Sequence, residues 1–443
     1  MRHAQAPALW RAEAALARWH RRVPARPTPL PGGQPLLGLV DTGGALLHPE
    51  FIGPAGPRVV ALWDQADRQA LWPWQSPPLG LRGRELLAAD LRAFIRQSGR
   101  PGASLANYRQ LAFPPNGTNP DHATQVLDAL AGPRLNDAAA RATLALVSLP
   151  PSLGRRPAGP EVLDALAYLL ACGTGPVLVA LAIGSSWGAR ALHPPSPFER
   201  ALDALLLREP RLMVVWAGGC AARLQACGLN TRFRAAHPIA LTWLPEPRAH
   251  QQLGLWSAGA PAPEWRIQAP DSALPSAWQV AKEGLWPLRP GALVACRRLG
   301  GRWEWVLELG PGADVSQPWR FELRAKAGAP LQCWLSRTPQ IGWLRCSEAA
   351  DGAPLLWNAM ASGRWPARVM EPGADVPADT LALALPAQGL AVLEGCSGAL
   401  VRATGSSTAA ALACRELFNR LSAQPATPPS RAMWSRLWAG LQA

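Results

Sequence analysis

Between residues 35 and 219, uninterrupted apolar runs of strand length alternate with longer segments of helical period, and this alternation restricts the fold more than any other feature. A strand that is apolar at every position must be buried on both faces, as parallel strands covered by helices are. The predicted strands are residues 35–40, 57–63, 142–149, 175–184 and 211–219, and the predicted helices are residues 83–97, 122–132, 161–173 and 198–209. The sequence therefore predicts an α/β three-layer fold with a mostly parallel central sheet.

The pattern changes between residues 237 and 365, where helical periodicity stops and short runs rich in Trp, Val and Leu are separated by Gly and Pro. Residues 292–299, 302–309, 319–327 and 330–337 have the alternation of antiparallel strands. Twelve of the 21 tryptophans fall in this block. They could stack sugars or bases, but the core of a small β-sandwich accounts for them more simply.

Strand and helix patterns resume after the β-rich block, with strands expected at 380–387 and 389–394 and a helix at 407–423. An α/β pattern that stops and resumes indicates an insertion within one domain. We expect an N-terminal helical extension (1–34), the first part of the α/β domain (35–236), an inserted antiparallel β-sandwich-like domain (237–365), and the second part of the α/β domain (366–443).

The net charge of +14 raises nucleic acid or an anionic membrane as partners, but its distribution argues against both. Lys282 and Lys326 are the lysines, and the arginines are dispersed without a long basic run. No apolar stretch is long enough to span a membrane, and Arg and Glu interrupt the opening segment where a signal peptide would have its apolar core. We expect a soluble cytoplasmic protein with no nucleic-acid or membrane partner.

The 8 cysteines are sparse and irregularly spaced, and no CxxC or CxxH pair offers a zinc site. Reduced, mostly buried thiols are expected instead. No acidic cluster argues for calcium. The sequence predicts no metal and no cofactor, and it makes no prediction of oligomeric state.

Asp41, His122 and Ser407 each stand at the end of a predicted element. Asp41 follows an apolar strand in LVDTGGALLHPEF, His122 opens the helix DHATQVLDALAG, and Ser407 begins a helix in ATGSSTAAALACREL. Open α/β sheets place their sites at the carboxyl ends of strands, and a carboxylate, an imidazole and a hydroxyl are the groups that nucleophilic acyl transfer needs. Singly, each segment also fits a turn or a helix cap.

Taken together, the segments resemble the Asp, His and Ser boxes of the subtilisin-like serine peptidases, in the chain order known for subtilisin. VLVALAIGSSWG (177–188) is similar to the family's substrate-pairing strand, and LMVVWAGGCAA (212–222) is similar to the strand end that carries the oxyanion asparagine. The resemblance covers roughly residues 35–236 and 366–422 and leaves the β-rich block outside.

The resemblance implies a serine endopeptidase that acts on a polypeptide substrate through an acyl-enzyme. His122 would be the general base for Ser407, and Asp41 would orient the imidazole. The oxyanion and substrate-binding positions would be Gly219, Gly184, Ser185 and Gly405. The substrate pocket, expected near residues 183–188 and 216–220, is built from mostly small, uncharged residues and favours an uncharged substrate side chain. The segment before residue 35 is too short for a folded pro-segment, so self-processing is not expected.

Several positions depart from the family pattern. Gly219 stands where the oxyanion asparagine is expected, and loss of such a donor costs about 3 kcal/mol unless Ser185, Ser186 or a water replaces it. Asp121, which we interpret as a helix cap, and Ala123 flank His122, and Ala411 replaces the proline that closes the Ser box. A catalytically silent scaffold that binds peptides or partner proteins therefore stays open as the alternative function.

Overall fold

The computed structural model describes residues 33–42, 48–65, 83–97, 121–150, 159–183, 197–217, 228–233, 237–245, 251–258, 261–299, 301–310, 312–335, 343–346, 364–369, 383–386, 390–393, 400–403, 406–424 and 430–442. Within these residues the apolar runs form a central eight-stranded sheet in the order β21-β20-β8-β7-β1-β6-β4-β5. Its strands are β1 (Leu36–Asp41), β4 (Val59–Asp64), β5 (Arg84–Leu87), β6 (Thr143–Ser148), β7 (Val177–Leu181), β8 (Leu212–Ala217), β20 (Arg364–Val369) and β21 (Leu383–Pro386). The pairings β8–β7, β7–β1, β1–β6 and β6–β4 are parallel, which confirms the predicted mostly parallel sheet.

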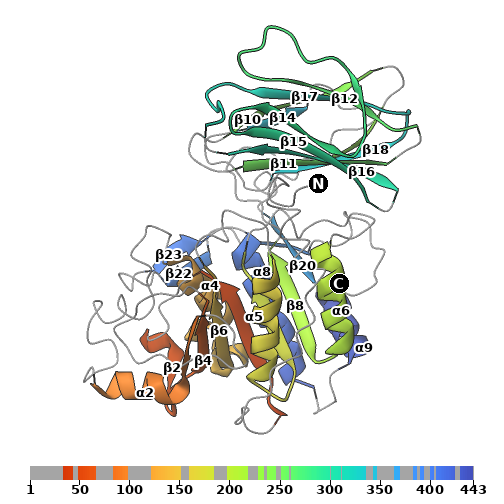
Figure 1. Cartoon of the computed structure of the whole chain (residues 1–443). Coiled ribbons are helices and arrows are strands. Elements are labelled where there is room, and N and C mark those ends of the chain that lie inside the picture. Colours follow the sequence, from red (N-terminus) through yellow and green to blue (C-terminus); the bar gives the residue numbers. More distant parts are fainter. Residues whose placement is uncertain are drawn as a thin grey trace.

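Helices cover both faces of this sheet (Figure 1). They are α2 (Ala88–Gln97), α4 (Asp121–Ala131), α5 (Pro160–Ala171), α6 (Pro197–Arg208), α8 (Ser406–Ser422) and α9 (Arg431–Gln442). Short elements complete this part: η3 (Pro49–Phe51), η5 (Pro133–Leu135), η6 (Ala139–Arg141), and the two-stranded pairs β2 (Ile52–Gly53) with β3 (Gly56–Pro57) and β22 (Leu390–Leu393) with β23 (Leu400–Ala403).

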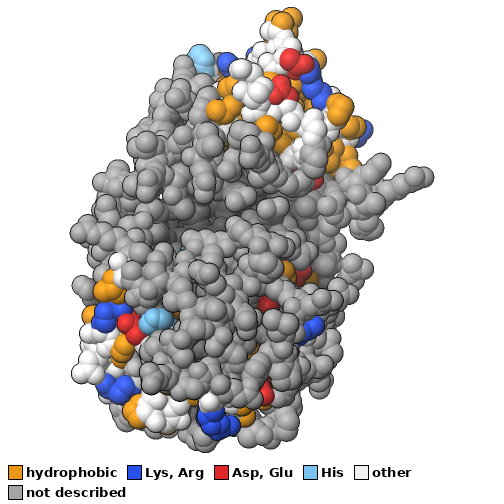
Figure 2. All heavy atoms as spheres, turned by 90° about the vertical axis from the view of Figure 1, so that its left-hand side faces the viewer, with side chains coloured by type: hydrophobic (Ala, Val, Ile, Leu, Met, Phe, Trp, Pro, Cys, Tyr) orange, Lys and Arg blue, Asp and Glu red, His pale blue; other side chains and the backbone are white. Residues whose placement is uncertain are grey.

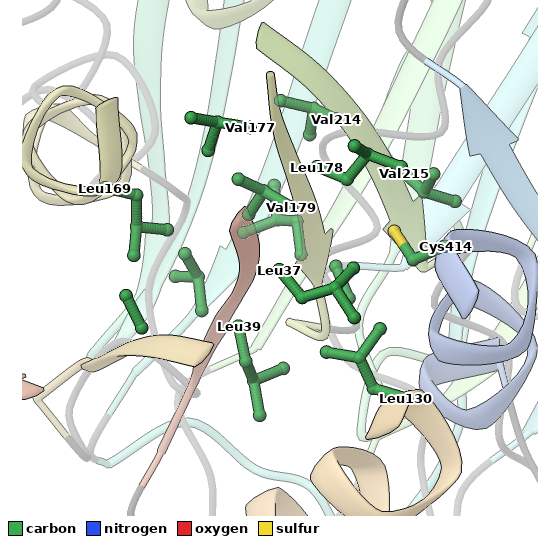
Figure 3. Close-up of a cluster of buried hydrophobic side chains, with 14 of the residues drawn as sticks. Leu37, Leu39, Leu130, Leu169, Val177, Leu178, Val179, Val214, Val215 and Cys414 are labelled. Carbon is green, nitrogen blue, oxygen red and sulfur yellow. The ribbon is translucent and has the colours of Figure 1, made fainter. Parts of the chain in front are cut away.

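Alternation along β1 decides which side chains face which helices. A Cβ on Gly38 would come within 2.9 Å of Leu169 of α5, so the side-chain direction at this position is toward α5 and the glycine lets that helix pack closely. Residues 37, 39 and 41 project to the opposite face. Figure 3 shows Leu169 on one side of β1 and Leu130 of α4 with Cys414 of α8 on the other. The strand therefore directs the Asp41 side chain toward the layer formed by α4 and α8.

The helix predicted over residues 83–97 is correct only for its second part. Residues Arg84–Leu87 form the edge strand β5, antiparallel to β4, and the helix α2 begins at Ala88. Glu85 is buried and accepts a hydrogen bond of 2.6 Å from the Tyr168 hydroxyl. Pairing with β4 and this buried contact override the local helical preference of the segment, because both come from residues distant in the chain.

The β-rich block folds as two antiparallel sheets around their own core. One sheet has the order β13-β12-β17-β10-β19 and the other β14-β15-β16-β11-β18-β9. Trp243, Trp265, Trp305 and Trp319 are fully buried there, as the sandwich-core interpretation of the tryptophans predicts. The strands are β9 (Gly228–Arg232), β10 (Ile239–Leu244), β11 (Gln251–Ala258), β12 (Glu264–Gln268), β13 (Gln279–Val280), β14 (Gly284–Arg289), β15 (Ala292–Leu299), β16 (Arg302–Leu309), β17 (Trp319–Arg324), β18 (Pro330–Leu335) and β19 (Trp343–Cys346).

The inserted unit is longer than the sequence boundaries of 237 and 365 indicate. Strand β9 pairs with β18 of the sandwich, so the unit includes residues from 228 onward. At the other end β20 already begins at Arg364, and it lies antiparallel to β8 with Ala367 opposite Ala217. The chain thus leaves the central sheet at the carboxyl end of β8 and re-enters it through β20 at the same end of the sheet. Because β1 and β8 point the same way, Asp41 also lies at this end. Figure 1 shows the sandwich stacked on the α/β part.

Within the described part of the chain, charged side chains of both signs lie on the surface and cysteines lie in the interior. Figure 2 shows acidic and basic side chains interspersed among the coloured residues of that face. Cys172, Cys296, Cys333 and Cys414 are buried and take part in no disulfide, as expected for these four. None of the described helices has the length and hydropathy that crossing a bilayer requires.

Candidate active site

Asp41 is the last residue of β1 and is almost completely buried, with 3% of its surface exposed. Its Oδ1 accepts the backbone N–H of Thr42 at 2.7 Å, and its backbone carbonyl accepts the N–H of Leu149 at 2.7 Å. These contacts hold the carboxylate at the carboxyl end of the strand. A buried carboxylate needs hydrogen-bond donors or a positive charge nearby to remain ionised.

His122 supplies that partner from the first turn of α4. Its Nδ1 lies 2.9 Å from Asp41 Oδ2 and 3.0 Å from Oδ1. An ionised carboxylate can only accept, so Nδ1 carries the proton of this hydrogen bond. In neutral His122, Nε2 then presents a lone pair, and 39% of the imidazole side chain is exposed. The pair therefore places Nε2 of His122, as a proton acceptor, at the carboxyl ends of the parallel strands.

The negative charge of Asp41 raises the pKa of His122 above its ordinary value of 6.5. Burial lowers this pKa, but the Asp41 charge has the larger effect, and the hydrogen bond to Asp41 adds to it. The pair therefore stabilises the folded state fully below the unfolded pKa of 6.5, and this contribution is lost as the pH rises through the higher folded pKa.

This pKa gives a prediction that does not depend on activity. In an NMR titration, the imidazole signal that disappears in His122→Ala is expected to titrate above pH 6.5, and in Asp41→Asn the same signal should titrate at lower pH because the charge is gone. An unchanged midpoint in Asp41→Asn would contradict the assignment of Asp41 as the cause.

Ser407 lies in the first turn of α8 and is buried. Its hydroxyl donates to the backbone carbonyl of Ala182 at 3.0 Å, and among the described residues this is its one hydrogen bond. The Ala182 N–H in turn donates to the Val40 carbonyl at 3.0 Å. Ser407 is therefore held against the end of β7, the strand next to β1, and two successive hydrogen bonds link it through Ala182 to Val40, the residue before Asp41.

The structure thus joins Asp41 to His122 directly and brings Ser407 to the neighbouring strand end, with its hydroxyl on Ala182 instead of the imidazole. Helices α4 and α8 pack against each other, which places the first turns carrying His122 and Ser407 in one layer above the sheet. Gly184, Ser185, Gly219 and Gly405 lie outside the described residues, as does the side chain of Asp121, so their expected roles stay predictions. Within the described part of the chain, no three His, Cys, Asp or Glu side chains converge as metal ligands would.

Sequence reasoning missed a polar cluster where the carboxyl end of α4 meets the second half of α8. Arg415 of α8 is buried, with 4% of its surface exposed, and contacts the Asp137 carboxylate and two carbonyls at the end of α4. The signal was available in the sequence, because Arg415 falls between Ala411 and Phe418 on the apolar face of the predicted helix. A charged residue on a buried helix face needs a partner.

The comparisons with known proteins give a structural likeness but no family. No protein-family model matches the chain, and the search of curated proteins finds no match. A solved structure described as the CspB protease of Clostridium perfringens is similar over 87% of this chain and 81% of that chain, with a TM-score of 0.58 and 13% sequence identity. The chain therefore shares its fold with that protease.

Proposed function

We propose that this protein is a serine endopeptidase of the subtilisin-like type, with Ser407 as nucleophile, His122 as general base and Asp41 as the residue that orients the imidazole. The observation that carries the proposal is the hydrogen bond between His122 and the buried Asp41 carboxylate at the carboxyl end of β1. The shared fold with a protease and the position of Ser407 beside the neighbouring strand end support it.

In the proposed reaction the Ser407 Oγ attacks the carbonyl carbon of a peptide bond while its proton passes to His122 Nε2. The imidazolium that forms is stabilised by the Asp41 carboxylate on Nδ1. His122 then gives this proton to the leaving amine as the C–N bond breaks, which leaves an acyl group on Ser407. In the second half-reaction, water deprotonated by His122 attacks the acyl carbon, and the imidazolium returns the proton to Ser407 Oγ as the Oγ–C bond breaks.

The negative charge on the attacked carbonyl oxygen needs donors nearby. α8 begins at Ser406, so the backbone N–H of Ser407 belongs to the first turn, where helix N–H groups have no intrahelical acceptor. This N–H and the positive end of the helix dipole are the donors we assign to the oxyanion. Gly219 offers no side-chain donor, so we expect slower turnover than with an asparagine at that position.

Before attack, the Ser407 hydroxyl has to change its hydrogen-bond acceptor from the Ala182 carbonyl to the His122 imidazole. The hydroxyl now donates to a carbonyl, and attack requires that it donate to an imidazole nitrogen. Rotation about the Cα–Cβ bond interconverts the staggered positions of a serine Oγ without moving the helix. The exchange replaces one neutral hydrogen bond by another and is expected to cost little.

Reaction with a biotin-linked fluorophosphonate tests the proposal. The serine oxygen forms a bond to phosphorus, fluoride leaves, and the serine proton is taken up by the base. We expect one labelled site, located at Ser407 by mass spectrometry of the tryptic peptides, and faster labelling as the pH rises through the pKa of His122. Absence of labelling across that pH range, in protein shown to be folded by circular dichroism, would refute the peptidase.

A second candidate function is a catalytically silent scaffold that binds peptides or partner proteins at the same edge of the sheet. The hydrogen bond from Ser407 to Ala182 is the observation that favours it, because a serine held on a carbonyl is not activated. A folded protein that resists labelling but binds an unfolded polypeptide would support this function. We propose no nucleic acid or membrane partner for either function.

A further inference from the structure

Arg415 connects the helix that carries Ser407 to the helix that carries His122. It lies eight residues after Ser407 on α8, about 12 Å along the helix axis. Its guanidinium donates to the Ala129 carbonyl at 3.2 Å and to the Gly132 carbonyl at 2.8 Å, at the carboxyl end of α4. A positive charge at this end complements both the free carbonyls and the helix dipole.

The same guanidinium binds Asp137, just beyond α4, in a bidentate ion pair. Nε lies 2.7 Å from Oδ2, and the NH2 nitrogen lies 2.9 Å from Oδ1. Asn419, one turn further along α8, donates to Asp137 Oδ2 at 2.9 Å and accepts the N–H of Ala139 at 2.9 Å. Burial by itself raises the pKa of Asp137, but these donors together lower it to about 2, so the carboxylate stays charged.

Arg58 also binds the segment that follows α4, where Asp137 lies. It donates to the carbonyls of Ala131 at 2.8 Å, Ala139 at 2.8 Å and Ala142 at 3.3 Å. Burial, and then the nearby positive charge of Arg415, lower the pKa of Arg58 to about 10. The turn that follows α4 is therefore fixed between Arg58, which precedes β4, and Arg415 of α8.

The contacts of Arg415 with the end of α4 matter because the buried residues of α8 between Ser407 and Arg415 are mostly small. Ala409, Ala410, Ala411 and Ala413 are fully buried there. Small side chains let helices approach closely, but they interlock poorly and specify the axial position of one helix against another less well than large ones. The directional bonds of the guanidinium fix both distance and angle.

We propose that Arg415 is a positioning residue for the reaction, which sets the axial position of α8 against α4 and thereby the distance between Ser407 and His122. The inference rests on the proposed function. A misplacement of about 1 Å far from the reacting atoms can cost roughly 100-fold in rate, so a contact about 12 Å from Ser407 is close enough to matter.

The test compares fluorophosphonate labelling rates of the full-length wild type, Arg415→Ala, Arg415→Lys and Arg420→Ala. Arg420 is the matched control, because it lies on the same helix with its side chain 39% exposed and pairs with Glu416 one turn away. Arg415→Ala is expected to label about 100-fold more slowly than the wild type, with the NMR titration midpoint of His122 unchanged. Millimolar guanidinium should restore part of this rate in Arg415→Ala and have no such effect on Arg420→Ala.

Arg415→Lys keeps the charge but loses the bidentate fork, so we expect a folded protein with an intermediate rate. If Arg415→Ala does not fold, Arg415→Lys decides the question. A folded Arg415 variant that labels at the wild-type rate would overturn the positioning role alone. Failure of both variants to fold would overturn it in favour of a purely structural role. Absence of labelling in the wild type would overturn the peptidase and this inference together.

Discussion

Replacing Ser407 by alanine is expected to lower kcat for hydrolysis of unfolded, fluorescently labelled casein by about 10⁶-fold, the scale seen when a triad serine is removed. The hydroxyl oxygen is the atom that would form the acyl bond, and alanine has no atom that can replace it. The side chain is small and its described hydrogen bond goes to the Ala182 carbonyl, so the substitution should leave the fold intact. Release of fluorescence over time measures the rate.

Ser406→Ala is the matched control, since it removes a hydroxyl from the adjacent residue of the same helix. This variant should keep kcat within a few-fold of the wild type. Comparable hydrolysis by wild type and Ser407→Ala would show that a contaminating peptidase or another nucleophile is responsible. Loss of activity in Ser406→Ala with retention in Ser407→Ala would move the nucleophile by one residue and overturn the assignment made here.

Replacing Asp41 by asparagine is expected to lower kcat by about 10⁴-fold at neutral pH. The asparagine oxygen can still accept the N–H of Thr42, which directs the amide NH2 toward His122 Nδ1. An amide N–H facing Nδ1 favours the tautomer with the proton on Nε2, and this tautomer cannot accept the serine proton. The variant also loses the charge that stabilises the imidazolium.

The pH profile separates these effects from simple unfolding. The acidic limb of kcat/KM reports the pKa of His122 in the free enzyme, so it should lie above pH 6.5 in the wild type and move to lower pH in Asp41→Asn. Asp64→Asn is the control, because Asp64 also ends a parallel strand of the same sheet, two strands away from Asp41. An Asp41→Asn rate within ten-fold of the wild type would refute the orienting role.

Local patterns in the chain predicted most of the regular structure. Fully apolar runs such as Val177–Leu181 have to be buried on both faces, and they form the parallel strands. The Trp-rich block folds as a sandwich whose core contains Trp243, Trp265, Trp305 and Trp319. The errors occur where a distant partner decides the outcome: β5 forms because β4 offers an edge, and β9 joins the sandwich because β18 pairs with it.

The sequence by itself determined the layers, most of the elements and the positions of Asp41, His122 and Ser407 at element ends, because hydrophobic period and end signals are local properties of the chain. Only the tertiary structure decided which of these groups meet. Strand alternation turns Asp41 toward α4 and so joins it to His122, while the packing of α8 against β7 places the Ser407 hydroxyl on Ala182. The contacts of Arg415 arise in the same way, since its partners at the end of α4 lie 278 to 286 residues earlier in the chain and meet it only through folding.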